Sequence, residues 1–287
     1  DAPSSRLETI RQAMIQDPRA RDWAMQGGDT TSGLPQMDDM NIMQKLLSED
    51  PGMGTEEPEI AANIGEQMLH MDMTPLPRSM RRRIRDICSR VKPRNAIIVG
   101  GGIGHLSAWL FDMWCGTSDS PRNSESRPGS LRIMEQGTRF GVIIDRLVRR
   151  YNAESWCSVV SSPWNEVVAE SASAIAANVA LPPDSLSVIL PLPVDLVVID
   201  LPQDERAEAP SIAFDLLAPG GLVLVQEPTV PTGDVGTPSD EDEPTPAQAK
   251  VESFNRWIGL VKKVNTDHSL GFAELTGGTL VALLKSE

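Results

Sequence analysis

Short, continuously apolar segments alternate with helix-like segments through the middle of the chain, and this alternation strongly constrains the fold. Five segments have the length and apolar content of buried strands: 96–99, 131–134, 158–160, 195–199 and 222–225. Helix-like stretches lie between them at 105–114, 138–151 and about 205–217. Strands that are apolar on both faces and joined by helices form a parallel sheet covered on both sides. The sequence therefore predicts an α/β, Rossmann-like fold.

The C-terminal end departs from this alternation. A helix predicted over 247–261 precedes two β-type runs, 269–275 and 279–284, which are joined across Thr276-Gly277-Gly278. Two strands joined by so short a Gly-rich turn run antiparallel. We therefore expect a mostly parallel sheet that is closed by an antiparallel C-terminal hairpin.

The first 75 residues differ in composition from the rest. They are rich in Met and contain helix-like segments at 5–15 and 39–47, separated by Gly and Pro loop signals. We interpret residues 1–75 as a helical cap on a catalytic domain at 76–287, with a flexible tail as the alternative. A homodimer formed through the Met-rich segment stays open.

A further helix is expected from Ser79, because Met80, Ile84 and Ile87 recur at helical spacing. Its other positions carry four arginines at 81, 82, 83 and 85. We interpret this cluster as a solvated face that balances nearby acids, with an anion-binding site as the alternative.

Composition excludes several classes of partner. Acids outnumber bases 40 to 26, a net charge of −14, so the surface repels nucleic acid and anionic lipid. Cysteine occurs three times, at 88, 115 and 157, without a C-x-x-C pair, which favours neither a disulfide framework nor a zinc cluster. There is no apolar run of membrane-spanning length and no signal-peptide pattern. We expect a cytoplasmic protein.

Glycines fill the turn between the first predicted strand and its helix. The run Gly100-Gly101-Gly102-Ile103-Gly104 is followed by His105, where a dinucleotide fingerprint would require glycine. Ligands bind at such turns in open α/β sheets, because glycine lets a ligand approach the backbone and a helix N-terminus presents free N–H groups. The spacing suits a nucleoside with an amino-acid tail better than a pyrophosphate, and tight packing is the alternative.

Carboxylates end two of the predicted strands. Glu135, followed by Gln136, closes the second strand, where an acid can accept both hydroxyls of a ribose; an exposed strand-end acid is the alternative. Asp200 ends the 195–199 strand, and Gln226 and Glu227 end the next one. Spacing alone suggests that these three side chains converge as oxygen ligands for Mg²⁺.

These elements together resemble the class I S-adenosylmethionine-dependent methyltransferases, specifically the catechol and caffeoyl-CoA type O-methyltransferases. The resemblance covers roughly 73–285. It is carried by NAIIVGGGIGHLSAWL, RIMEQ, DLVVIDLPQDERAEAPSIAFDLLAPGGLVLVQEP and FNRWIGL…LTGGTLVALLK. It implies a seven-stranded sheet with an antiparallel last strand, and methyl transfer to an oxygen of a small-molecule acceptor.

The resemblance also implies a set of site residues. Those expected to contact S-adenosylmethionine are Gly100, Gly101, Gly102, Gly104, His105, Glu135, Gln136, Ser162, Pro163, Trp164 and Asp200. Within this set Glu135 would hold the ribose, and Ser162-Pro163-Trp164 would lie near the adenine. A divalent metal such as Mg²⁺ would be held by Asp200, Gln226 and Glu227, lowering the pKa of the acceptor hydroxyl.

Three positions depart from the family pattern. Ile98 replaces an acidic residue, Gln203 stands where the family has its catalytic Lys, and Gln226-Glu227 replaces an Asp-Asn metal pair. Asp200 and His105 remain the candidate catalytic residues, with His105 as a substitute base or, alternatively, a structural histidine. Three other functions stay open: a cofactor-binding pseudoenzyme with a scaffolding role, an aminopropyltransferase, and a nicotinamide-dependent dehydrogenase.

Overall fold

A computed structural model of the protein describes residues 39–116, 123–176, 190–203, 205–232 and 245–286. Within them, seven strands form one sheet in the order β3-β2-β1-β4-β5-β7-β6. The strands are β1 (Asn95–Val99), β2 (Ser130–Met134), β3 (Cys157–Val160), β4 (Val194–Ile199), β5 (Leu217–Gln226), β6 (Ser269–Leu275) and β7 (Gly278–Leu284). Strands β1 to β5 are parallel, and β7 is antiparallel to both β5 and β6. The predicted fold class is confirmed.

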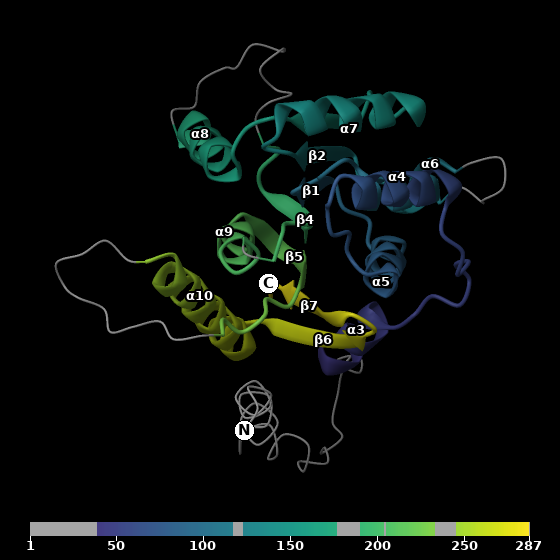
Figure 1. Ribbon diagram of the computed structural model, residues 1–287. Coiled ribbons are helices and arrows are strands. Elements are labelled where there is room, and N and C mark those ends of the chain that lie inside the picture. The colour runs from purple at the N-terminus through teal and green to yellow at the C-terminus, as the bar shows by residue number, and fades with distance from the viewer. Residues whose placement is uncertain (1–38, 117–122, 177–189, 204, 233–244, 287) are drawn as a thin grey trace, which may run out of the picture.

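Helices cover both faces of the sheet. They are α3 (Asp39–Leu47), α4 (Glu59–His70), α5 (Arg78–Cys88), α6 (His105–Cys115), α7 (Thr138–Arg150), α8 (Trp164–Ala176), α9 (Ala209–Asp215) and α10 (Pro246–Asp267). In Figure 1, α8, α9 and α10 lie on one side of the sheet, and α4, α5 and α6 lie on the other. None of the described helices is both long and apolar enough to span a membrane.

The two helical layers explain why the central strands are apolar throughout. Successive strand residues point to opposite faces, so in β1 Ile98 packs with the α4–α7 layer and Ile97 with the α8–α10 layer. Both side chains are buried. A strand that is buried on both faces needs a continuous apolar run instead of alternation. This is the pattern from which the parallel sheet was predicted.

Two boundaries differ from the sequence prediction. The helix expected over 205–217 is the shorter α9, and the Pro219-Gly220-Gly221 segment belongs to the start of β5, whose register shifts there. On α7, Val142 is 50% exposed and Ile144 is buried. The helix expected at 5–15 lies outside the described residues.

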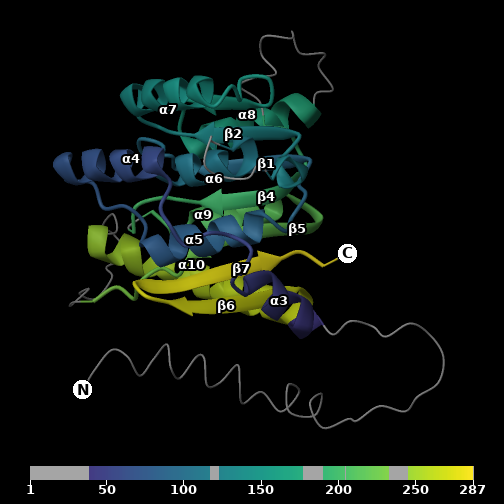
Figure 2. The ribbon, with the colours of Figure 1, turned by 90° about the vertical axis from the view of Figure 1, so that its right-hand side faces the viewer.

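The segment before β1 packs against the sheet and its helices. Helix α3 contacts the edge strand β6, and α4 and α5 both contact α6. Figure 2 shows α3 lying over β6 at the end of the sheet. At Gly271 of β6 an added Cβ would lie 2.6 Å from Leu47 Cδ1, so the helix approaches the strand backbone closely. The boundary at residue 75 stays a prediction.

The arginine cluster of α5 was expected to be a solvated face that balances nearby acids. The arginines do pair with acids, but the face is largely covered. Arg81 and Arg85 are each only 5% exposed, because the loop before α4 and helix α6 cover them. Arg85 binds Asp86 and lies over the Trp109 ring. Arg82 and Arg83 reach Glu49, beyond the end of α3. The cluster therefore fastens the N-terminal segment to the domain.

Candidate functional site

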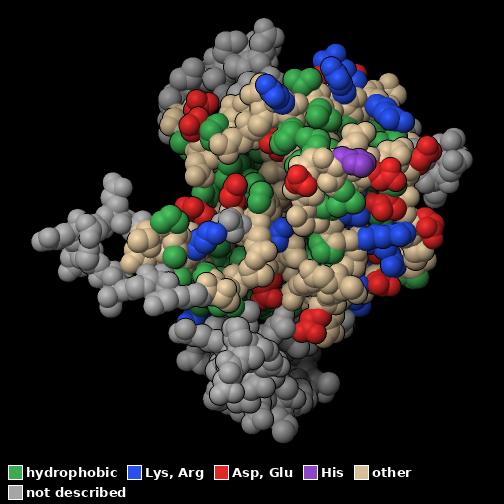
Figure 3. Space-filling model, in the orientation of Figure 1, with side chains coloured by type: hydrophobic (Ala, Val, Ile, Leu, Met, Phe, Trp, Pro, Cys, Tyr) green, Lys and Arg blue, Asp and Glu red, His purple; other side chains and the backbone are tan. Residues whose placement is uncertain are grey.

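A cavity of about 1100 Å³ opens at the carboxyl ends of the parallel strands. It lies where the strand order reverses between β1 and β4, the position at which open α/β sheets bind ligands. Both acidic and basic side chains line it, among them Glu135, Asp200, Arg81 and Arg206. Figure 3 shows this face of the molecule, with side chains of both charges around the central hollow.

The glycine loop forms one wall of the cavity. Gly100 has φ of 79°, which favours glycine, and a Cβ there would lie 2.7 Å from the Asp200 carbonyl oxygen. The loop therefore runs against the end of β4 at a distance that no side chain would allow. Helix α6 begins directly after it, and His105 and Leu106 of its first turn line the cavity. The positive end of the α6 dipole thus lies at this wall.

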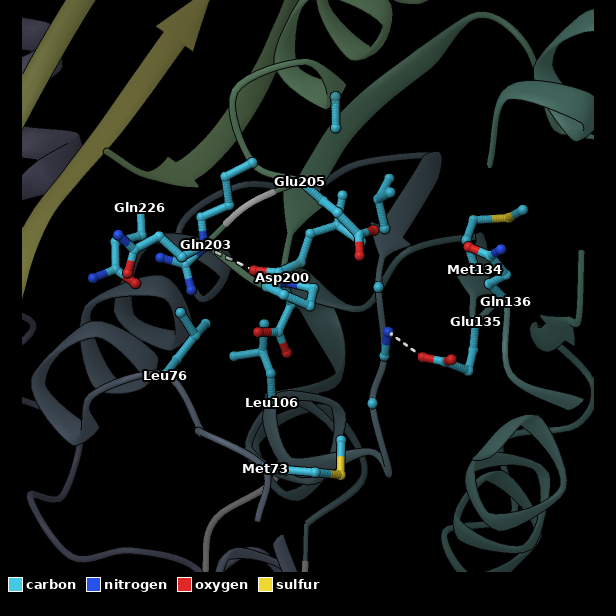
Figure 4. Close-up of a pocket in the computed structure, with 18 of the residues that line it drawn as sticks. Met73, Leu76, Leu106, Met134, Glu135, Gln136, Asp200, Gln203, Glu205 and Gln226 are labelled. Carbon is cyan, nitrogen blue, oxygen red and sulfur yellow. Dashed lines mark hydrogen bonds between the residues drawn. The ribbon is translucent and has the colours of Figure 1, made fainter. Parts of the chain in front are cut away.

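Glu135, just after β2, ties the loop to the next strand. Its Oε2 accepts a hydrogen bond from the Gly101 N–H at 3.1 Å, and its Oε1 accepts one from the Gly137 N–H at 2.8 Å. The first of these bonds is the dashed line beside Glu135 in Figure 4. A carboxylate has about four acceptor positions, so two remain for a ligand. Glu135 is held rigidly and can still accept hydroxyl donors.

Asp200 lies at the end of β4, between the half of the cavity that Glu135 and Gln136 line and the half that Gln203 and Gln226 line. Desolvation raises its pKa to about 7, against the opposing charges of Arg206 and Arg81. Figure 4 shows Asp200 near Gln203 and Gln226, while Glu135 and Gln136 lie across the glycine loop. A carboxyl group with a pKa near neutrality can accept and release a proton at physiological pH.

Glu57, which the sequence analysis missed, organises the wall behind the glycine loop. Its Oε1 accepts hydrogen bonds from Arg81 Nη2 at 2.9 Å, His105 Nε2 at 3.1 Å and Trp109 Nε1 at 3.2 Å. Burial alone would raise the pKa of Glu57, but the hydrogen bond from His105 and the charge of Arg81 hold it below its ordinary value. Glu57 is therefore a carboxylate at neutral pH.

His105 is 4% exposed, and its ring is fixed by Glu57. Desolvation and the charge of Arg81 lower its pKa, so the ring is neutral at pH 7. Since the Glu57 carboxylate accepts from Nε2, the ring proton lies there. Nδ1 is buried and has no hydrogen-bond partner among the described residues. A role for His105 as a base stays a prediction and falls on Nδ1.

Most of the predicted cofactor residues meet in this one cavity. Those that line it are Gly100, Gly101, Gly102, His105, Glu135, Gln136, Ser162, Pro163, Trp164 and Asp200. Gly104 does not line it; an added Cβ there would instead lie 2.8 Å from Leu147 Cδ2 of α7. Glycine at position 104 therefore allows the loop to pack closely against α7.

The three residues expected to hold a metal do not converge. Asp200 and Gln226 line the cavity, but Glu227 does not. The Gln226 side-chain amide donates to the Gly277 carbonyl at 3.0 Å. The described residues contain no group of three or more His, Cys, Asp or Glu side chains placed to hold a metal ion. This donor set does not fit a divalent cation site.

The side chain of Gln203, which stands where the family has its catalytic Lys, also has a hydrogen-bond partner within the protein. Its side-chain amide donates a hydrogen bond to the Thr229 hydroxyl. Arg206, which follows it in the same turn, lines the cavity and influences Asp200 electrostatically. Neither Arg206 nor Glu57 carries a local sequence signal, because each is defined by contacts made across the fold.

The comparisons with known proteins place the fold. No protein-family model and no curated protein sequence matches the chain. Three solved structures illustrate the structural likeness. The O-methyltransferase TomG from Streptomyces achromogenes, solved with SAM, matches with a TM-score of 0.52 and 16% identity, over 86% of this chain and 96% of that one.

An O-methyltransferase from Bacillus cereus, solved with SAH, has a TM-score of 0.50 and 15% identity, over 86% of this chain and 96% of that one. A methyltransferase from Geobacter sulfurreducens has a TM-score of 0.50 and 12% identity, over 89% and 100%. At such identities the likeness concerns the fold. The chain therefore has the fold of the class I methyltransferases, as its motifs predicted.

Proposed function

We propose that the protein is an S-adenosylmethionine-dependent methyltransferase that acts on an oxygen of a small molecule. The observation that carries this proposal is the joint placement of the glycine loop, Glu135 and Asp200 around one cavity at the switch point of the sheet. The fold agrees with it, since two of the similar structures are O-methyltransferases solved with SAM or SAH.

The residues of the cavity fit this cofactor. Glu135 keeps two free acceptor positions for the ribose hydroxyls. The Trp164 side chain lines the cavity, and its buried Nε1 has no hydrogen-bond partner among the described residues. The loop offers space over Gly102, where an added Cβ would meet only Met73 Cε, at 3.4 Å. A nucleoside with an amino-acid tail suits this combination of a carboxylate, an aromatic donor and open glycine backbone.

When bound, S-adenosylmethionine supplies an electrophilic methyl group on its sulfonium. Asp200 lies at the boundary between the cofactor half and the half that contains Gln203 and Gln226. With a pKa of about 7 it is largely a carboxylate at slightly alkaline pH, and it accepts the proton of an acceptor hydroxyl held there. The cofactor would supply its methyl group to that oxygen, with cleavage of the sulfur–methyl bond and release of SAH. The three side chains expected to hold a metal do not meet in the cavity, because Glu227 does not line it, so this assignment uses none.

Turnover tests this assignment of Asp200. The purified protein is incubated with S-adenosylmethionine and a mixture of small phenols, alcohols and carboxylic acids, and the SAH formed is measured by mass spectrometry. We expect Asp200→Asn to reduce SAH formation by about 100-fold or more, the typical contribution of a general base. The matched control is Asp215→Asn, which changes an exposed residue at the end of α9 outside the cavity. Equal turnover by wild type and Asp200→Asn would contradict the assignment.

A cofactor-binding pseudoenzyme is the second candidate. It is favoured by Gln203 and Gln226, whose side chains bind Thr229 and Gly277 in place of the Lys and the metal pair expected from the family. The two functions differ in one result. Tight SAH binding without turnover of any acceptor in the mixture supports the pseudoenzyme, whereas turnover that depends on Asp200 excludes it.

A further inference from the structure

Arg206 lines the cavity, and most of its donors make no hydrogen bond within the described part of the chain. Its Nε donates to the Leu201 carbonyl at 2.8 Å, which fixes the side chain back toward the end of β4. Among the described residues it makes no other hydrogen bond and no ion pair. Its two terminal nitrogens therefore have no partner among the residues that the structure describes, although Arg206 lines the cavity. A guanidinium group is always charged and binds planar oxygen acids well.

The other described arginine that lines the cavity, Arg81, donates hydrogen bonds to protein groups through both terminal nitrogens. Arg81 donates through Nη1 to the Leu76 carbonyl and through Nη2 to Glu57 at 2.9 Å. Its charge is thus balanced within the wall. Arg256, on the neighbouring α10, pairs with Glu208 and Glu252 at the surface. Of the two described arginines that line the cavity, Arg206 is the one whose terminal nitrogens make no hydrogen bond to another described residue.

The surroundings of Arg206 define which half of the cavity it serves. Asp200 lies within its electrostatic influence, and Gln203 lines the same cavity. Figure 4 shows Asp200, Gln203 and Gln226 on the side of the cavity away from Glu135. This is the half left for the acceptor when the cofactor lies over the glycine loop, an arrangement that depends on the proposed function. The side-chain amides of Gln203 and Gln226 are occupied by Thr229 and Gly277.

A second hollow of about 400 Å³ continues from this half. It shares Gln203 and Ser253 with the main cavity, and its wall includes the apolar side chains of Val230, Val251 and Phe254. An acceptor held beside Arg206 can therefore extend an apolar body into this hollow. Charge at one end and apolar surface at the other are what a phenol or an aromatic acid presents.

We propose that Arg206 forms an oxyanion subsite for the acceptor. This subsite selects an acceptor with an acidic hydroxyl group and an apolar body, such as a phenol, over a neutral alcohol. In this arrangement Arg206 supplies the positive charge of the acceptor half of the cavity. It binds the ionised oxygen directly, while Asp200 stands beside it to take the proton.

The probe for this subsite is 4-nitrophenol, a phenol with a ring for the second hollow, whose ionised form absorbs visible light. Protein saturated with SAH is added to a dilute solution of the probe at a pH where the probe is mostly protonated. We expect the wild type to increase the phenolate absorbance, because Arg206 binds the ionised form. In Arg206→Gln we expect this binding to weaken about tenfold or more, the effect of losing a hydrogen bond to a charged group. Arg206→Lys keeps the charge and should retain part of the binding.

Two controls separate this proposal from others. Calorimetric titration with SAH shows whether Arg206→Gln is folded and keeps its cofactor half, and we expect an affinity within about twofold of wild type. Arg256→Gln removes a nearby surface arginine and should bind the probe as wild type does. The proposal is overturned if Arg206→Gln and wild type give equal phenolate signals. It is also overturned if wild type binds SAH but produces no phenolate signal. Failure of SAH binding itself would contradict the proposed function instead.

Discussion

Replacing Glu57 by Gln removes the carboxylate that three buried donors share. Arg81 and His105 have side chains only 6% and 5% exposed, so water cannot compensate them well when Glu57 loses its charge. The change leaves a buried guanidinium without its counter-charge. It also weakens the hydrogen bonds from His105 and Trp109, which hold α6 against the segment before α4.

The magnitude follows from burial and from what Gln retains. Removing one partner of a buried ion pair costs about 3–5 kcal/mol. Glu57 is 21% exposed, which reduces this penalty, and the Gln amide oxygen still accepts one of the three hydrogen bonds. We therefore expect Glu57→Gln to lower the free energy of unfolding by about 2–3 kcal/mol at pH 7.

Urea unfolding followed by circular dichroism measures this difference. The matched control is Glu56→Gln, since Glu56 is 93% exposed and pairs with Arg78 at 3.4 Å, and its loss should cost less than about 0.5 kcal/mol. Because the pKa of folded Glu57 lies below its ordinary value of 4.5, its contribution is full above that value and is lost as the pH falls through the folded pKa. The gap between wild type and Glu57→Gln should shrink in acid. A gap below about 1 kcal/mol at pH 7, or one equal to that of Glu56→Gln, would refute the reasoning.

Three further predictions concern the cavity itself. The pKa of Asp200 is raised from 3.8 to about 7, so the folded protein loses stability as the pH rises between these values. In urea titrations we expect Asp200→Asn to be about 1–3 kcal/mol more stable than wild type at pH 8, and this difference should close toward pH 4. Gly100→Ala should lower the melting temperature, because Gly100 has φ of 79° and lies against the Asp200 carbonyl. Its control, Gly259→Ala, lies at an exposed position of α10 with open space around it and should raise the free energy of unfolding by about 0.5–1 kcal/mol. Treatment with EDTA should leave SAH and 4-nitrophenol binding within about twofold of untreated protein, and a large loss restored by Mg²⁺ would show that a metal acts here.

The sheet could be predicted because burial on both faces leaves a direct trace in the sequence. Strands such as β4 are apolar at every position that both helical layers cover. The C-terminal hairpin was likewise set by its short Gly-rich turn between β6 and β7. The glycines at 100–102 and the acids at 135 and 200 line one cavity, because each follows the end of a parallel strand.

The contacts that cross the fold could not be predicted. Arg81 lies on the polar side of an amphipathic helix, which usually indicates solvent, yet its partner Glu57 comes from a loop 24 residues earlier. Periodicity within one helix carries no information about which other segment covers it. The side chains predicted to hold a metal do not meet, and the reason is local. Adjacency in the sequence does not show which of two neighbouring side chains faces a cavity, and here Gln226 lines it whereas Glu227 does not.

Calorimetric titration with SAH tests the central claim most directly, because it needs no knowledge of the acceptor. We expect micromolar binding by wild type and binding about tenfold weaker or more in Glu135→Gln, which loses the charge that we propose to face the ribose hydroxyls. The matched control, Glu154→Gln, changes an exposed acid before β3 and should bind as wild type does. Absence of SAH binding by wild type, or equal affinity in wild type and Glu135→Gln, would contradict the assignment of this cavity to S-adenosylmethionine.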